Sequence, residues 1–371
     1  MIGLFVPGSG EYANGMAIGG KSGYPPGLYT TSWLTLGPRL GFAYDIFGNG
    51  RTAIRGGFGM FKDRPQGNPT FYTNGQPPVA YSPTLYYGDL STYAQGGGNV
   101  GPTSLLTLLA HNKVATVMNF SLGIQHQIWK TTIDVSYVGA LSRHLIVRRN
   151  LNPIPMYARF DLPKNEDPTQ PGKPLPDNFL RPYKGIADIN LQEFSGNANY
   201  NALQISANRR WTRGLQFGLA YTYSKTLGVC SDDYTAVSPY FNPRQRNYGP
   251  LPYDRPNVFA LNYIYDLPKV GTKTGVKPLG WLLDNWQISG ITSFVAGAPF
   301  TPGHGTKEGA DITGSTEGAR ITVIGNPELS KTERSFYRFF NTAAFARTPV
   351  RSFGNGGVNY LYGPGVNNWD I

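Results

Sequence analysis

Residues 15–22 are the most specific chemical pattern in the sequence, and that pattern would bind phosphate. They read Gly-Met-Ala-Ile-Gly-Gly-Lys-Ser, which matches the P-loop expression whose backbone amides and lysine cradle phosphates between a strand and a helix. The flanking residues do not fit this context, because Pro25 and Pro26 follow closely and a helix cannot run through them. We therefore interpret residues 15–22 as a flexible glycine-rich loop and do not expect nucleotide binding.

The other patterns that could carry chemistry are weaker. The glycine-rich run Arg55–Gly59 lies inside an alternating strand pattern, where glycine permits curvature or close backbone approach. Ser231-Asp232-Asp233 lacks the spaced carboxylates of a calcium loop. The histidines have neither metal-ligand spacing nor neighbouring carboxylates; they are His111, His126, His144 and His304. No nucleophile elbow or paired-carboxylate motif stands out, so we expect no enzymatic activity, no metal site and no cofactor.

The composition favours a folded, strand-rich protein. The chain has 371 residues, with 47 Gly, 30 Pro and 13% aromatic residues, and only 15% charged residues against the usual ~25%. Turn formers and aromatic residues in these amounts suit strands and turns rather than long helices or disorder. The single cysteine, Cys230, excludes an intrachain disulfide framework.

Alternating apolar and polar residues predict four pairs of antiparallel strands. The paired segments are 39–46 with 51–60, 118–128 with 132–137, 203–210 with 215–224, and 259–267 with a strand starting at 286. Short links at 48–50, 130–131, 212–214 and 268–284 alternate with long links at about 62–114, 147–199, 226–255 and 296–366. Transmembrane barrels have this asymmetry, with short periplasmic turns and long outer loops. A soluble sandwich or propeller is the alternative interpretation.

The barrel interpretation assigns a side and a face to particular residues. Asn49, Lys130 and Arg213 are predicted on the periplasmic side, with Gly97, Asp167, Asp233 and Gly314 outside. Residues predicted to face lipid are Phe120, Leu122, Phe217, Leu219 and Leu261. Candidate lumen-facing residues are Arg39, Arg55, Gln125, Asp134, Gln204, Asn208, Arg210 and Gln216. Trp129, Trp211 and Trp286 adjoin the short links and are predicted to form an interfacial girdle.

The net charge of +11 would suit nucleic acid, anionic lipid or another phosphate-bearing surface. Basic residues gather outside the predicted strand interiors, namely Arg143, Arg148, Arg149, Arg159, Arg244, Arg246, Arg255, Lys331, Arg334 and Arg338. No nucleic-acid-binding fold is recognisable, so no nucleic-acid partner is expected. On an outer membrane, the same charge would meet lipopolysaccharide phosphates.

Several short motifs occur together in a recognisable order. They are Pro38–Asp45 with Gly48–Gly50 and Arg55–Gly59, Tyr137–Gly139, Tyr200–Gln204, Tyr221–Lys225, Asp254-Arg255, Phe340–Phe345, Gly363–Gly365 and Asn368–Asp370. This set, spread over residues 36–371, resembles the barrel of the large Oar-like TonB-dependent receptors of the Acidobacteria type, which often carry a carboxypeptidase-regulatory-like domain. The resemblance implies an outer-membrane barrel of about 22 strands around a plug domain. It also implies import of a substrate, which the sequence does not identify, driven by the TonB complex.

The chain departs from that family pattern in ways that predict a partial barrel. Neither a plug-like segment nor a TonB box is recognisable, and a further strand begins at Asn368. We therefore expect a loop segment over 1–35, then about eight strands and the start of another over 36–371, forming an open, curved sheet or a gapped barrel rather than a closed one. A secreted or surface β-rich adhesin that binds glycans is the alternative function.

Overall fold

The computed structural model describes most of the chain. It covers residues 34–63, 99–109 and 113–371 except 233, 276 and 306–310, together with shorter stretches within 2–32 and 71–91. Gly97 and Asp233, which were predicted in outer loops, lie outside the described residues. Among the described residues, no helix is long and apolar enough to cross a bilayer.

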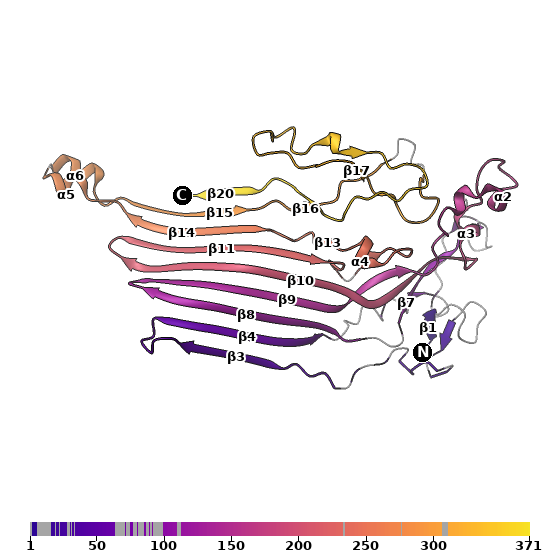
Figure 1. The fold of residues 1–371 in the computed structure, drawn as a ribbon, viewed down its shortest axis with the longest axis horizontal. Coiled ribbons are helices and arrows are strands. Elements are labelled where there is room, and N and C mark those ends of the chain that lie inside the picture. The colour runs from indigo at the N-terminus through magenta and orange to yellow at the C-terminus, as the bar shows by residue number, and fades with distance from the viewer. Residues whose placement is uncertain are drawn as a thin grey trace.

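One long antiparallel sheet dominates the structure (Figure 1). Its strands follow one another in space in nearly the same order as in the sequence. They are β3 (Arg39–Asp45), β4 (Thr52–Asp63), β8 (Ala115–Ile128), β9 (Thr131–Asn150), β10 (Ile186–Thr212), β11 (Leu215–Gly228), β14 (Asn257–Asp266), β15 (Gln287–Val295) and β20 (Val366–Asp370). This up-and-down order confirms the predicted all-β class and the four predicted strand pairs.

The sheet is open. Within the described residues, β3 pairs with β4 alone along the sheet path, and β20 pairs with β15 alone. Figure 1 shows these two strands at opposite edges, so the strand at Arg39 does not meet the strand at Gln287. This confirms the expected open sheet.

Glycines inside the strands accommodate aromatic rings from neighbouring strands. A Cβ on Gly56 would collide with the ring of Phe42, and a Cβ on Gly139 would collide with the ring of Phe120. Each ring therefore occupies the space that a side chain on the opposing glycine would fill. This explains why a sheet so rich in glycine keeps its register.

Short turns gather at one end of the sheet, which we name the turn end, and long connections gather at the other, the loop end (Figure 1). Trp129 and Arg213 occupy the left-handed region with φ of 54° each, as tight hairpins require. In the first turn, Asp45 accepts a 2.6 Å hydrogen bond from the Gly50 amide. Asp167 and Gly314 belong to the connections at the opposite end.

Two strands run further than predicted. β9 has 20 residues and β10 has 27, so the connection predicted at 147–199 is reduced to 151–185. Their outer halves form a ribbon that β7 (Thr103–Leu108) and β12 (Ala236–Val237) extend in parallel. Val147 and Ile189 are fully buried there. This small core beyond the main sheet stabilises the extra strand length.

The remaining elements are short. The predicted loop at 1–35 contains a hairpin of β1 (Ile2–Phe5) and β2 (Met16–Ile18), so a strand replaces the centre of the P-loop match. The link at 268–284 holds two helices, α5 (Val270–Thr274) and α6 (Lys277–Leu283). The loop end carries β5 (Leu85–Tyr86), β6 (Asn99–Val100), η3 (Ala158–Phe160), α2 (Leu162–Asn165), α3 (Asp177–Leu180), α4 (Pro243–Arg246), β13 (Gly249–Pro250), β16 (Pro299–Phe300), β17 (Thr322–Val323), η4 (Thr342–Ala344), β18 (Phe345–Ala346) and β19 (Leu361–Tyr362).

Candidate functional site

One face of the sheet, named the polar face, collects most of the candidate lumen residues. Gln125 lies directly opposite Asp134, and Asn208 lies opposite Gly218. Directly paired residues share a face, so the ladder places Arg39, Arg55, Gln125, Asp134, Gln204, Asn208 and Gln216 together on it. Arg210 lies in the irregular register between Arg209 and Thr212, so its face is not fixed by strand pairing.

Small residues make room for polar groups on this face. A Cβ on Gly218 would lie 3.2 Å from Asn208 Oδ1 and would also collide with Asn262 Oδ1. The glycine therefore lets two amide side chains from neighbouring strands approach across it. On β9, Ser136 Oγ donates a 2.5 Å hydrogen bond to Asp134 Oδ1. The polar face thus carries hydrogen-bonding side chains on several neighbouring strands.

The opposite face, named the apolar face, carries all five residues predicted to contact lipid. The register aligns Phe120 with Phe58, Leu122 with Tyr137, and Leu219 with Leu261. Large side chains on this face stay exposed: Leu40 is 74% exposed, Leu122 56% and Tyr223 57%. Soluble monomeric proteins rarely expose so many large apolar side chains on one continuous face. This exposure favours the membrane interpretation over a soluble sandwich.

At the loop end, a polar cavity of about 750 Å³ opens between three connections. Its lining residues come from the outer halves of β9 and β10, from the connection between them (residues 159–181), from residues 236–247, and from residues 311–318. Both charge signs face it, with Arg148, Arg159 and Arg181 beside Asp177, Asp188, Asp311 and Glu317. We name it the loop-end cavity.

Ion pairs fix the walls of the loop-end cavity. Arg159 bonds Asp177 at 2.9 Å and also pairs with Asp311, which joins segments far apart in sequence. Burial acts to lower the pKa of Arg159, but the hydrogen bonds that it donates to its two carboxylate partners prevail and raise the pKa. Arg246 and Glu317 form a 2.7 Å pair with side chains only 10% and 13% exposed.

These pairs change the expected role of some basic residues. Arg149 bonds Glu193 through two nitrogens, at 2.7 and 3.2 Å, and Arg143 donates to Asn199 at 2.7 Å. Together with Arg159 and Arg246, these arginines hold the loop end together instead of projecting toward an outside phosphate surface. Sequence spacing could not show this, because most of the carboxylate partners lie in distant segments.

Asp254 is a fully buried carboxylate that fastens the loops to the sheet. It accepts a 2.6 Å hydrogen bond from the Thr226 amide on β11 and another of 2.6 Å from Tyr362 Oη on β19. Burial, reinforced by the bond to Asp254, raises the pKa of Tyr362 well above its ordinary value. These hydrogen bonds explain the Asp254-Arg255 motif structurally, and its sequence context alone did not reveal them.

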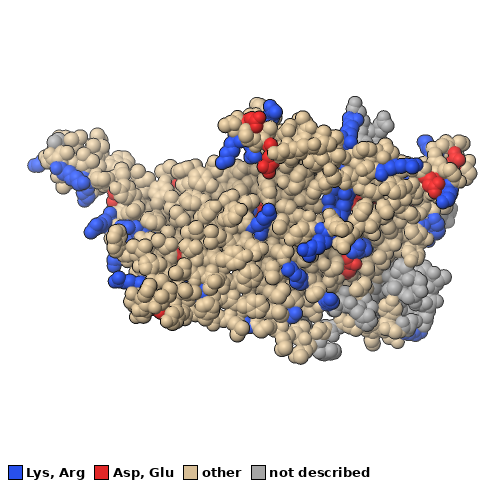
Figure 2. Space-filling view, viewed as in Figure 1, with Lys and Arg blue, Asp and Glu red and all other residues tan. Residues whose placement is uncertain are grey.

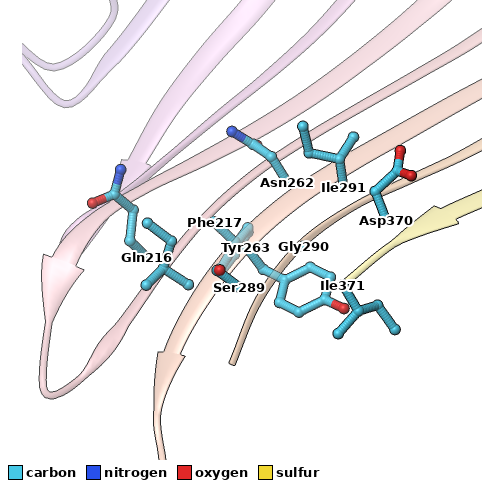
Figure 3. Close-up of a pocket in the computed structure, with 10 residues that line it drawn as sticks. Gln216, Phe217, Asn262, Tyr263, Ser289, Gly290, Ile291, Asp370 and Ile371 are labelled. Atoms are coloured by element: carbon cyan, nitrogen blue, oxygen red, sulfur yellow. The ribbon is translucent and has the colours of Figure 1, made fainter. Parts of the chain in front are cut away.

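A second hollow, of about 480 Å³, lies beside the end of β20 (Figure 3). Asp370 is the last residue of β20 that pairs with β15, where it meets Ile291. Along the described strands, Gly290 and its preceding residues in β15 have a partner on the β14 side only. The hollow therefore lies along a stretch of β15 that is paired on one side only.

The sequence matches the family model described as "Outer membrane beta barrel domain" over residues 2–371. The chain belongs to this outer membrane β-barrel family. The protein therefore resides in the outer membrane. This location agrees with the exposed apolar face and disfavours the alternative of a soluble secreted adhesin.

Solved structures similar to this barrel chain share little sequence with it. They include the outer membrane transporter YddB from Escherichia coli, with 12% identity, a TM-score of 0.43, and coverage of 73% of this chain and 30% of that one. The ferric-catecholate import receptor Fiu from E. coli has 11% identity, a TM-score of 0.36 and coverage of 81% and 30%. The ferripyoverdine receptor of the Pseudomonas aeruginosa outer membrane has 11% identity, a TM-score of 0.35, and coverage of 72% of this chain and 24% of that one. This chain thus spans less than a third of each. No curated protein matches the sequence.

The candidate girdle residues lie together at the turn end of the barrel sheet. Trp129 is 88% exposed, Trp211 47% and Trp286 60%. An exposed tryptophan at the rim of an apolar strand face has its ring at the level of lipid headgroups in membrane proteins. Their girdle role, like the lumen role of the polar face, stays a prediction.

Proposed function

We propose that this chain is the wall of a TonB-dependent receptor of the Oar-like type, which imports a polar substrate across the outer membrane. The two-faced sheet supports this most strongly. One face is apolar and exposed, while the other carries amides, hydroxyls and carboxylates spaced by glycine. We further propose that the chain binds and passes its substrate without catalysing a reaction.

The unpaired edges support a barrel larger than nine strands. Backbone groups left open on β3 and β20 would cost several kcal/mol each in hydrocarbon, so further strands must pair with both edges. A barrel of eight or so strands fills its interior with large side chains. Here Gly123, Ala220 and Gly218 occupy polar-face positions instead. Small residues suit a wide lumen that surrounds a plug domain.

The loop-end cavity is the proposed first contact for the substrate. It lies at the loop end, which we assign to the cell exterior because transmembrane barrels carry their long loops outside. Because arginines and carboxylates both line it, it suits a polar ligand with groups of both signs rather than an apolar one. The ion pairs described above hold the walls in place before any ligand arrives, which lowers the entropy cost of binding.

Depletion of compounds from the medium tests this proposal. Cells with or without the full protein, each with TonB present or deleted, are grown in one complex medium, and mass spectrometry measures what each strain removes. We expect at least one polar compound to be depleted only when the protein and TonB are both present. Depletion that is independent of TonB would refute energy-coupled import.

A matched pair of variants then tests whether the loop-end cavity takes part in uptake. Arg148 lines the loop-end cavity, whereas Arg244 on α4 is exposed outside it. We expect Arg148→Gln to slow depletion of that compound and Arg244→Gln to leave it unchanged. Equal rates in the two variants would remove the cavity from the uptake route.

A further inference from the structure

The helices α5 and α6 form a built unit at the turn end of the sheet. Asp284 accepts hydrogen bonds from the amides of Gly271 and Thr272 at 2.8 and 3.0 Å, and from the Thr272 hydroxyl at 2.7 Å. A Cβ on Gly271 would collide with the backbone of Gly280. The two helices are therefore held in contact by the carboxylate of Asp284 and by the close approach of Gly271 to Gly280. A simple hairpin turn would need neither.

The unit exposes large apolar side chains. Trp281 is 90% exposed and Leu282 68%. Trp286 follows α6, and its indole nitrogen donates a 2.7 Å hydrogen bond to the Leu282 carbonyl. Trp286 precedes Ile288 of the apolar face by two residues, so Trp286 continues that face past the start of β15. Trp281 and Leu282 lie on the helix just before it.

Cations lie at the same end of the sheet as these apolar groups. Lys269, Lys273 and Lys277 lie on the unit, Arg213 lies on the adjacent turn, and Lys130 and Arg51 lie on the turns further along the sheet; all six are exposed. We name these six residues the basic rim. Figure 2 shows Lys and Arg gathered at this end, including on the projecting α5–α6 unit. None of the ion pairs found among the described residues involves the basic rim.

The nearest carboxylates are already engaged. Asp45 accepts from backbone amides of its own turn, Asp266 accepts from Gln287, and Asp284 holds the helix pair. Hydrogen bonding from Thr272 lowers the pKa of Asp284, so this carboxylate stays ionised within the unit. Asp284 also interacts electrostatically with Lys269, but the cations of the basic rim outnumber these carboxylates. The rim therefore keeps an excess of positive charge that can face an external anion.

We propose that the α5–α6 unit and the basic rim dock on the periplasmic leaflet of the outer membrane and bind the phosphate groups of anionic phospholipids. Trp281 and Leu282 enter the headgroup boundary, while the lysines bind phosphate above them. This arrangement is the one that amphipathic interfacial segments use, with apolar side chains in the boundary and basic groups on the polar side. The unit would fix the depth of the barrel wall at its turn end.

Continuity and charge together favour a bilayer over a protein partner. Trp286, which follows α6, extends a strand face that contacts lipid in the barrel assignment, and the exposed Trp281 and Leu282 lie on the helix next to it. Each lysine near an anionic surface strengthens attachment about fivefold, so three lysines give on the order of a hundredfold.

A fluorescent probe on α6 tests the docking. The full protein with Cys230→Ser and Leu282→Cys is labelled with an environment-sensitive dye and reconstituted in phosphatidylcholine vesicles with or without phosphatidylglycerol. We expect a blue shift and quenching by headgroup spin-labelled lipid that grow with the phosphatidylglycerol fraction and weaken in high salt. A probe at Val350→Cys, which is 65% exposed at the loop end, should respond to neither.

Charge variants test whether docking depends on the lysines of the basic rim or only on the net charge of the protein. Lys269→Gln, Lys273→Gln and Lys277→Gln together should lower the docked-to-undocked ratio by on the order of a hundredfold. The matched control removes three exposed loop-end lysines, Lys164, Lys173 and Lys331, and should leave the ratio unchanged.

Two results would overturn the proposal. One is a probe at residue 282 that stays open to aqueous iodide whatever the lipid composition, while a second probe at Leu122→Cys reports lipid. The other is an equal effect of the two triple variants. Because the salt dependence is measured on the unsubstituted rim, the test does not depend on whether the lysine variants fold.

Discussion

Leu122→Arg tests the assignment of the apolar face at the depth where a charge costs most. Leu122 is six residues from Ile128, the last residue of β8 at the turn end. At ~3.4 Å per residue and a strand tilt of ~40°, this is ~15 Å along the membrane normal. Half of a ~30 Å hydrocarbon core is about the same distance, so the substitution places a guanidinium near the bilayer centre.

The expected penalty is large enough to measure. An arginine at the midplane of a barrel's lipid face costs ~2–4 kcal/mol, which is about 30- to 700-fold in the folding equilibrium. Gln125→Arg, three residues along the same strand, faces Asp134 across the ladder and should cost far less. Urea titration of the full protein in liposomes, read by tryptophan fluorescence, measures both free energies of unfolding. Equal penalties for the two arginines would refute the face assignment.

Other predictions concern the two ends of the sheet. Cysteine introduced at Lys173, an exposed residue of the connection that holds Asp167, should react with an impermeant thiol reagent on intact cells, whereas cysteine at Lys130 should react only after the outer membrane is opened; the reverse pattern would invert the topology. Arg246→Met should lower the free energy of unfolding by ~3–5 kcal/mol because it leaves Glu317 buried without its partner, and Arg246→Met with Glu317→Leu should recover most of that loss in the same titration. The raised pKa of Tyr362 means that its contribution to stability is complete below the unfolded-state value of ~10 and is lost as pH rises above it; Tyr362→Phe should flatten the fall in loop-end stability over this alkaline range, and an unchanged slope would contradict the role given to its hydroxyl.

The regular part of the fold could be predicted because strand alternation is a local signal. Phe120, Leu122 and their polar neighbours on β8 repeat with period two, and the period alone assigns faces. The open sheet also followed from local features, since small residues such as Gly123 and Gly218 occupy polar-face positions that a small closed barrel would fill with large side chains.

The loop end and the helix unit could not be predicted in the same way. Residues 186–199 were assigned to a loop, because β10 there is stabilised by distant residues such as Leu105, which packs with Ile189. The cavity walls depend on pairs such as Arg159 with Asp311, which are 152 residues apart. The α5–α6 unit depends on the contact of Gly271 with Gly280, and no periodic pattern in so short a segment reveals it.

The most direct test of the membrane-barrel account is a spin-label accessibility scan of β8 from Met118 to Gln125 in the full protein reconstituted in bilayers. The account predicts period two, with the even positions open to oxygen, which concentrates in lipid, and the odd positions open to a water-soluble nickel reagent. Accessibility without alternation, or with oxygen favouring Gln125 over Leu122, would contradict it.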